Sequence, residues 1–255
     1  MYARFVALGD STTEGVGDEP YRDGTPSGWA DRLAVRMARA WPGLRYANLA
    51  VRGTVTRQVR THQVGPACAL EPDLASVLVG MNDLIRPRFD GGTVAADIDA
   101  VAARLRDAGA DVLLMTFPDL SSVSPVGRLL RGRVDDLSDR IREIASRRGA
   151  LLLDAAAVPA AGDPRVWADD RLHLNPEGHL LLADAMADLV GVPGADDRWR
   201  HPLPPPPARR IAERALGEAA WFGTHVGPWL GRRLSGRSSG DGRVAKRPHL
   251  TSVET

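Results

Sequence analysis

Short apolar runs alternate with longer amphipathic stretches along the first 190 residues. The apolar runs are nearly continuous rather than alternating with polar residues, which is typical of strands covered on both faces. On this basis the predicted strands are Ala3–Leu8, Leu44–Asn48, Leu74–Val79, Val112–Thr116 and Leu151–Asp154. The predicted helices are Gly28–Ala40, Thr54–Ala67, Thr93–Ala108, Gly127–Arg148 and Pro176–Val190.

This alternation predicts a three-layer α/β/α sandwich around a five-stranded parallel sheet with right-handed crossovers. A chain of 255 residues suits one such domain with an appendage, and a hydrophobic fraction of 44% can fill a sizeable core. We therefore expect one domain over residues 1–192. In sheets of this kind, ligands bind at the carboxyl ends of the strands.

The character of the chain changes near residue 193. Residues 201–210, "HPLPPPPARR", predict a proline-rich linker, and residues 235–255 predict a basic disordered tail. Residues 209–234 between them predict one or two short helices that carry Trp221, Phe222 and Trp229. These aromatic side chains are expected to dock on the domain, with a membrane-surface or partner helix as the alternative. The segment around 206–234 could act as a lid over a site or as a brace.

Charge and composition limit the function classes. The formal net charge of +1 argues against strong attraction to nucleic acid or to an anionic membrane, although residues 198–255 hold 11 Lys+Arg against 4 Asp+Glu. Without a recognisable leader or an apolar run of about 18–20 residues, we expect a cytoplasmic protein with no transmembrane segment. Cys68 is the single cysteine, so no internal disulfide can form.

Chemically versatile residues follow the predicted strands. Ser11 follows the first strand, Gly53 the second and Asn82 the third, while "DDRLHLNPEGH" follows the last. Each residue alone has a structural explanation, because serine and asparagine cap helices and glycine permits a left-handed turn. The carboxyl ends of parallel strands share one edge of a sheet, however, so these residues are expected to converge there.

Four sequence blocks occur together in a recognisable order: "GDSTTEG", "NLAVRG", "GMND" and "DDRLHLNPEGH". With these blocks the chain resembles the SGNH (GDSL-type) hydrolase family over about residues 3–190. Thr12 stands where the family name has leucine. The resemblance implies a flavodoxin-like sandwich and a lipase-like esterase that acts on a small-molecule ester through a serine nucleophile, without a cofactor.

The residues themselves suit acyl transfer. Ser11, at a strand-to-helix turn, could present its hydroxyl as the nucleophile, and His173 is the candidate general base. Asp170 precedes His173 by three residues, close enough to accept a hydrogen bond from the imidazole and to fix its tautomer. The neighbouring Asp169 is expected to face solvent.

The resemblance further implies an oxyanion hole formed by the backbone N–H groups of Ser11 and Gly53 and by the side-chain amide of Asn82. The absence of a side chain at Gly53 would let a substrate oxygen approach its amide closely. Asp10 and Asp83 are expected to brace their loops rather than to take part in the chemistry.

Three further residues are candidates for the substrate pocket, each with a structural alternative. Glu14 could point into the pocket or form a surface ion pair. Trp167 and Phe117 could form pocket walls or pack in the core.

Other signatures are weaker. "GRSSG" at residues 236–240 has the spacing of a nucleophile elbow but lacks a preceding buried strand. The glycines after the first strand are followed by no Walker lysine, since the single lysine of the chain is Lys246. His173 and His179 flank Glu177 without a zinc spacing, so no metal site is predicted, and His179 is expected to pack at the start of its helix.

The sequence therefore predicts a serine ester hydrolase for a small or medium acyl group, acting through an acyl-serine intermediate. An acyltransferase with the same site, or a catalytically silent binding module on the same fold, are the alternatives. A sugar acetate, a lysophospholipid and a secondary-metabolite ester all suit these residues as substrates, and the sequence does not indicate an oligomeric state.

Overall fold

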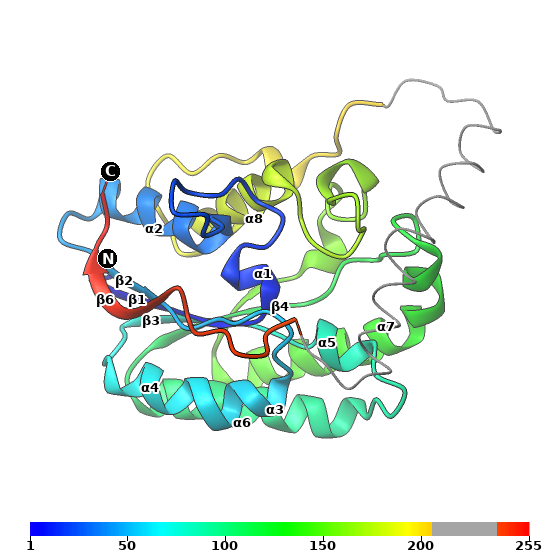
Figure 1. Ribbon diagram of the computed structural model, residues 1–255, viewed down its shortest axis with the longest axis horizontal. Helices are drawn as coiled ribbons and strands as arrows, with labels where there is room; N and C mark the ends of the chain where they lie inside the picture. Colours follow the sequence, from blue (N-terminus) through cyan, green and yellow to red (C-terminus); the bar gives the residue numbers. More distant parts are fainter. Residues whose placement is uncertain (206–238, 255) are drawn as a thin grey trace.

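The computed structural model describes residues 1–205 and 239–254. Its centre is one six-stranded sheet with the strand order β5-β4-β3-β1-β2-β6 (Figure 1). The strands are β1 (Arg4–Gly9), β2 (Arg45–Asn48), β3 (Leu74–Leu78), β4 (Asp111–Met115), β5 (Leu151–Leu153) and β6 (Arg247–Ser252). The first five are parallel, and β6 is antiparallel to β2.

Helices cover both faces of the sheet (Figure 1). The α-helices are α1 (Ser11–Glu14), α2 (Gly28–Ala40), α3 (Thr56–Gln58), α4 (Val64–Ala69), α5 (Met81–Leu84), α6 (Gly91–Asp107), α7 (Pro125–Arg148) and α8 (Pro176–Leu189). A π-helical turn, Val59–Gln63, joins α3 to α4, and short 3₁₀ turns lie at Ala155–Ala157, Pro164–Val166 and Arg198–Arg200.

Each face of the sheet has its own apolar core. In β1, Val6 and Leu8 pack with residues of α4, α6 and α7, whereas Phe5 and Ala7 pack with residues of α2 and α8. Because both faces are buried, the strands need apolar residues at nearly every position. The predicted α/β sandwich with helices on both faces of a mainly parallel sheet is confirmed.

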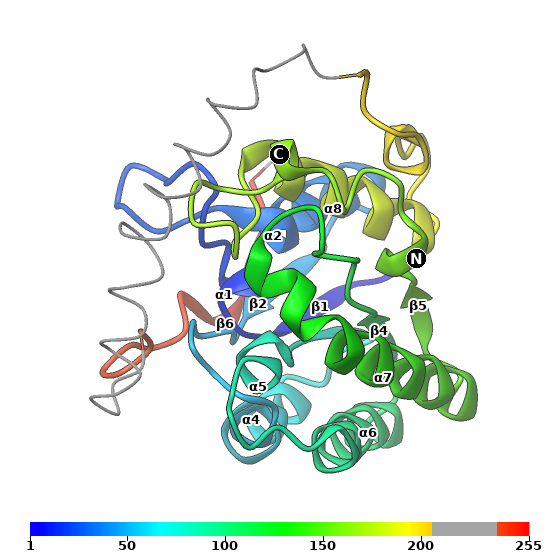
Figure 2. The ribbon, with the colours of Figure 1, turned by 90° about the vertical axis from the view of Figure 1, so that its right-hand side faces the viewer.

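The strand order places the candidate residues. β1 lies between β3 and β2, so the segments that follow these strands are neighbours at one edge of the sheet. Those segments carry Ser11, Asn82 and Gly53, respectively. Figure 2 looks toward this edge, where α1 and α5 follow their strands.

Two predictions are wrong in detail. The sheet has a sixth strand, and residues 247–252, which were expected to be disordered, form it by pairing with the exposed edge of β2. The predicted helix Thr54–Ala67 is present as continuous helical backbone from Thr56 to Ala69, but a π-helical turn at Val59–Gln63 separates α3 from α4. The predicted aromatic segment with Trp221, Phe222 and Trp229 lies outside the described residues.

Within the described parts, no helix combines the length and apolarity that spanning a membrane requires.

Candidate active site

The turn that carries Ser11 is built by close packing of its backbone. Gly9 has φ +149°, and a Cβ at this position would lie 2.2 Å from the carbonyl oxygen of Leu78, so only glycine fits beside β3. The carboxylate of Asp10 then caps α1 by accepting a hydrogen bond from the Thr12 N–H at 3.1 Å. Ser11 is therefore the first helical residue after a sharply turned strand.

Gln63, which the sequence analysis missed, fixes the peptide groups on both sides of Gly9. Its Oε1 accepts a hydrogen bond from the Gly9 N–H, and its Nε2 donates one to the Gly9 carbonyl, both at 2.9 Å. The π-helical turn at Val59–Gln63 brings this side chain to the end of β1. No pattern in the sequence pairs residues 54 positions apart.

A hairpin-like loop carries the predicted base and its partner. The Ala168 N–H donates to the carbonyl of His173 at 2.8 Å, and Trp167 pairs with Leu174 across the loop. Asp170 lies in the turn that the Ala168–His173 pair closes, with Arg171 at φ +54°, and His173 stands at the end of this turn. Such a backbone conformation is unfavourable for a residue with a side chain and often marks a functional turn.

Asp170 and His173 form a close pair. The Nδ1 atom of His173 lies 2.6 Å from Oδ2 of Asp170, whose Oδ1 accepts hydrogen bonds from the N–H groups of Leu172 and His173 at 3.0 Å. Burial opposes the charge, but these hydrogen bonds and the imidazole outweigh it and lower the pKa of Asp170 to about 2. An ionised carboxylate can only accept, so in the neutral imidazole Nδ1 carries the proton and Nε2 has the lone pair.

The loop with His173 lies against the segment that follows Ser11. At Gly17, a Cβ would be 2.1 Å from the carbonyl oxygen of Leu174 and 3.3 Å from Cβ of His173. His173 is also close enough to Asp10 that an imidazolium there would favour the ionised carboxyl group of Asp10. The structure thus brings the Asp170–His173 pair to the same edge of the sheet as Ser11.

Among the described residues, the backbone N–H groups of Ser11 and Gly53 at this edge have no acceptor. Gly53 has φ +77°, a conformation that favours glycine, so its amide is presented without a side chain. An N–H group without an acceptor, and with no side chain beside it at Gly53, is suited to donate a hydrogen bond to a substrate oxygen.

The Asn82 amide joins the three neighbouring segments. Its Nδ2 donates to Oδ2 of Asp10 at 3.2 Å and to the carbonyl of Thr54 at 3.1 Å. Burial raises the pKa of Asp10 to about 7, against the hydrogen bonds from Thr12 and Asn82 that stabilise its charge. Asp83 accepts hydrogen bonds from the N–H and hydroxyl of Thr56 at 3.0 and 2.8 Å, as expected for a bracing residue.

The three pocket candidates have other partners. Glu14 is buried. Its carboxylate accepts hydrogen bonds from Nε of Arg52 at 2.8 Å, from Nη2 at 2.5 Å and from the Arg52 backbone N–H at 2.6 Å. Phe117 belongs to a core cluster and lies against Gly80. Trp167 is half-buried and donates from Nε1 to the carbonyl of Ala161 at 3.0 Å. We therefore assign Glu14 and Phe117 to support of the site rather than to its wall.

His179 differs from His173 in being fully buried. Its Nδ1 accepts a hydrogen bond from the Trp29 N–H at 3.2 Å, and its Nε2 donates to the carbonyl of Val16 at 3.1 Å. Burial lowers the pKa of His179 to about 4 because it disfavours the charged imidazolium. This histidine is a neutral link between α8, α2 and the segment after α1.

The low pKa of His179 predicts a pH-dependent stability. The unfolded chain binds a proton at this histidine below about pH 6.5, whereas the folded chain binds one only near pH 4. The contribution of His179 to the free energy of unfolding is therefore complete above pH 6.5 and decreases as the pH falls toward 4. Urea unfolding of wild type and His179→Gln should give free energies whose difference shrinks on acidification, by up to about 1.4 kcal/mol per pH unit. The exposed His62, changed to Gln, is the matched control. Parallel curves for wild type and His179→Gln would contradict the prediction.

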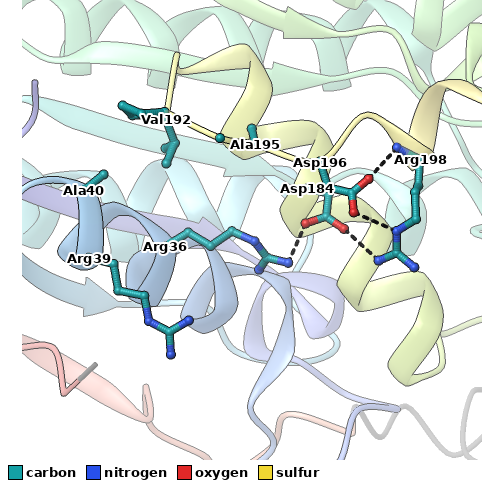
Figure 3. Close-up of a pocket in the computed structure, with 10 residues that line it drawn as sticks. Arg36, Arg39, Ala40, Asp184, Val192, Ala195, Asp196 and Arg198 are labelled. Carbon is teal, nitrogen blue, oxygen red and sulfur yellow. Dashed lines mark hydrogen bonds and ion pairs between the residues drawn. The ribbon is translucent and has the colours of Figure 1, made fainter.

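The structure has one hollow away from the candidate site and another on the edge of the sheet that carries the site. One, of about 490 Å³, is lined by residues of α2, α8 and the segment after α8 (Figure 3). Buried Asp184 contacts Arg36 at 2.5 Å and Arg198 at 3.5 Å there, and these ion pairs fasten the segment after α8 to the domain. The other, of about 720 Å³, lies between the loops that follow β4 and β5, on the edge that carries the site. In the described parts of the chain, no cluster of three or more His, Cys, Asp or Glu could hold a metal ion.

Comparison with known proteins assigns the chain to a family. The model of the GDSL-like lipase/acylhydrolase family matches residues 7–181. The chain belongs to this family. It is a serine ester hydrolase, as the order of the four sequence blocks predicted.

Similar proteins are known in sequence and in structure. An acetylxylan esterase of Geobacillus stearothermophilus is 23% identical over 210 residues, which cover 74% of this chain and 94% of that protein. The crystal structure of that organism's acetylxylan esterase Axe2 has a TM-score of 0.64 at 20% identity, covering 77% of this chain and 97% of the other. LAE5, an alpha/beta hydrolase enzyme from the metagenome of Lake Arreo, Spain, has a TM-score of 0.62 at 24% identity, covering 74% and 95%.

Proposed function

We propose that this protein hydrolyses esters of short acyl groups, acetyl esters above all, with Ser11 as nucleophile and His173 as general base. The observation that carries the proposal is the 2.6 Å contact of His173 with an ionised Asp170. This contact leaves Nε2 of the imidazole as a proton acceptor at the edge of the sheet where Ser11 lies.

In the proposed first half-reaction, Oγ of Ser11 attacks the ester carbonyl while Nε2 of His173 takes the hydroxyl proton. The negative oxygen of the tetrahedral intermediate accepts hydrogen bonds from the N–H groups of Ser11 and Gly53. The Asn82 amide would join them by replacing or sharing one of its two long hydrogen bonds. When the intermediate collapses, His173 returns the proton to the departing alcohol and an acyl-serine remains.

In the second half-reaction, a water molecule attacks the acyl-serine and gives its proton to His173. Collapse of that intermediate releases the carboxylic acid and restores the Ser11 hydroxyl. Asp170 keeps the imidazole oriented and stabilises its protonated form in both halves.

Two observations from the relatives support these roles and the acyl group. Structures of Axe2 described as catalytic mutants carry alanine in place of a serine, of an aspartate and of a histidine three positions after that aspartate. Asp170 and His173 have the same spacing. The curated relative is named for acetylxylan, an acetyl ester of a carbohydrate. The hollow of about 720 Å³ after β4 and β5, lined by both polar and apolar residues, offers room for the alcohol part of such a substrate.

A graded ester panel tests the proposal. We expect kcat/KM to be highest for the acetyl ester in a series of p-nitrophenyl acetate, butyrate and octanoate, and to be measurable with acetylated xylo-oligosaccharides. A maximum at octanoate would refute the short-acyl assignment. No turnover of any ester by well-folded protein, together with no labelling by a fluorophosphonate, would favour a binding module.

A further inference from the structure

The C-terminal residues 239–254 form a strap over the edge of the sheet, beyond the residues that the family matches. We call these residues the C-terminal strap. Its strand β6 lies beside β2 (Figures 1 and 2). The two strands pair with Tyr46 opposite Thr251 and Asn48 opposite Arg247. The strand that leads to Gly53 is therefore held on its outer side by the end of the chain.

Lys246 anchors the strap in the domain. Its ammonium group donates to Oδ2 of Asp31 at 2.9 Å and to the carbonyls of Pro26 and Ser27 at 2.7 and 2.6 Å, and its side chain is only 8% exposed. Burying a lysine is unfavourable unless its charge and its donors are satisfied, as they are here. Leu250 adds an apolar contact, because it is buried in the core cluster that contains Leu49.

Beyond this anchor, the strap reaches the loop that carries Gly53. A Cβ on Gly240 would lie 2.1 Å from the carbonyl oxygen of Arg52 and 3.4 Å from Cγ1 of Val51. The backbone of the strap thus lies against the Arg52 carbonyl with no room for a methyl group.

The Arg52 carbonyl and the Gly53 N–H belong to one peptide group, which is planar and rigid. Whatever fixes the carbonyl oxygen therefore fixes the direction of the N–H on the other side. From inside the domain, Glu14 holds Arg52 by its backbone N–H and by its guanidinium. From outside, Gly240 limits the position of the carbonyl.

We propose that the C-terminal strap positions the oxyanion loop, with Gly240 setting the orientation of the Arg52–Gly53 peptide and Lys246 anchoring the strap. Gly240 and Lys246 are thus positioning residues. The effect of the strap on catalysis rests on the proposed function, whereas its effect on the conformation of the loop does not.

The test is Gly240→Ala in the full chain, with Gly132→Ala as matched control. Gly132 lies on the exposed side of α7, where an added Cβ meets nothing within 4 Å. For Gly240→Ala we expect faster amide hydrogen exchange in peptides spanning residues 49–55 and a fall of about tenfold or more in kcat, since a lost oxyanion donor reduces turnover about 10²–10³-fold. KM for p-nitrophenyl acetate should stay close to that of wild type. Gly132→Ala should change neither exchange nor kcat.

If Gly240→Ala does not fold, Lys246→Gln tests the role of the strap instead. It keeps donors for the two carbonyls but removes the charge opposite Asp31, and it should produce the same changes to a smaller degree. Unchanged exchange at residues 49–55 in the folded variants would overturn the inference, as would a rise in KM with unchanged kcat. An inactive wild type would overturn the proposed function instead, and hydrogen exchange alone would then decide the role of the strap.

Discussion

Replacing Ser11 with alanine is expected to lower kcat on the best acetyl ester by about 10⁶-fold, because removing a nucleophile abolishes the acyl-serine route altogether. The residual rate should still exceed that in water, since the Ser11 and Gly53 N–H groups remain to stabilise the oxyanion. The double variant with His173→Ala should be no slower than the single variant, because the two side chains act as one unit.

Thr12→Ala is the matched control for Ser11→Ala. Thr12 is the next residue of α1 and also carries a hydroxyl group, and its N–H, which donates to Asp10, is kept in the variant. Steady-state kinetics and fluorophosphonate labelling should show wild-type behaviour for Thr12→Ala, and only the residual turnover and no labelling for Ser11→Ala. Substantial turnover by Ser11→Ala would refute Ser11 as the nucleophile.

The sequence was most informative where burial is complete. The strands β1 and β3 are apolar on both faces, and α2 has the bounds Gly28–Ala40 that its amphipathic pattern predicted. β6 escaped prediction because an edge strand is held mainly by backbone hydrogen bonds. Leu250 is its one buried residue, and the polar residues around it are typical of an exposed tail.

Contacts within the site were predictable where the two residues are close in sequence or follow strands that end at the same edge of the sheet. The spacing of Asp170 and His173 indicated their contact, whereas the partner of Glu14 could not be read from the sequence. Arg52 lies 38 residues away, and only the adjacency of β1 and β2 brings them together. The contact of Gly240 with Arg52 depends on the unpredicted strand in the same way. The catalytic roles themselves stay predictions.

Asp170→Asn should lower kcat about 10⁴-fold while leaving the fold intact, as loss of the correct histidine tautomer does in serine hydrolases. Oδ1 of Asp170 accepts two backbone N–H groups, so the carbonyl oxygen of the new asparagine would remain there. Its NH₂ group would then face Nδ1 of His173 and donate to it. The proton of the imidazole would move to Nε2, which could no longer accept the proton of Ser11.

The exposed neighbour Asp169, changed to Asn, is the matched control for this variant, because it alters the same net charge one residue away without touching His173. We expect Asp169→Asn to keep wild-type kcat and melting temperature, and Asp170→Asn to fold with a lower melting temperature, because the ionised carboxylate that stabilises the loop is lost. The reverse pattern, with activity lost in Asp169→Asn and kept in Asp170→Asn, would show that the 2.6 Å contact is not the one that orients the base. In that case Asp170 would not fix the tautomer of His173, and Nε2 would not be assigned as the proton acceptor.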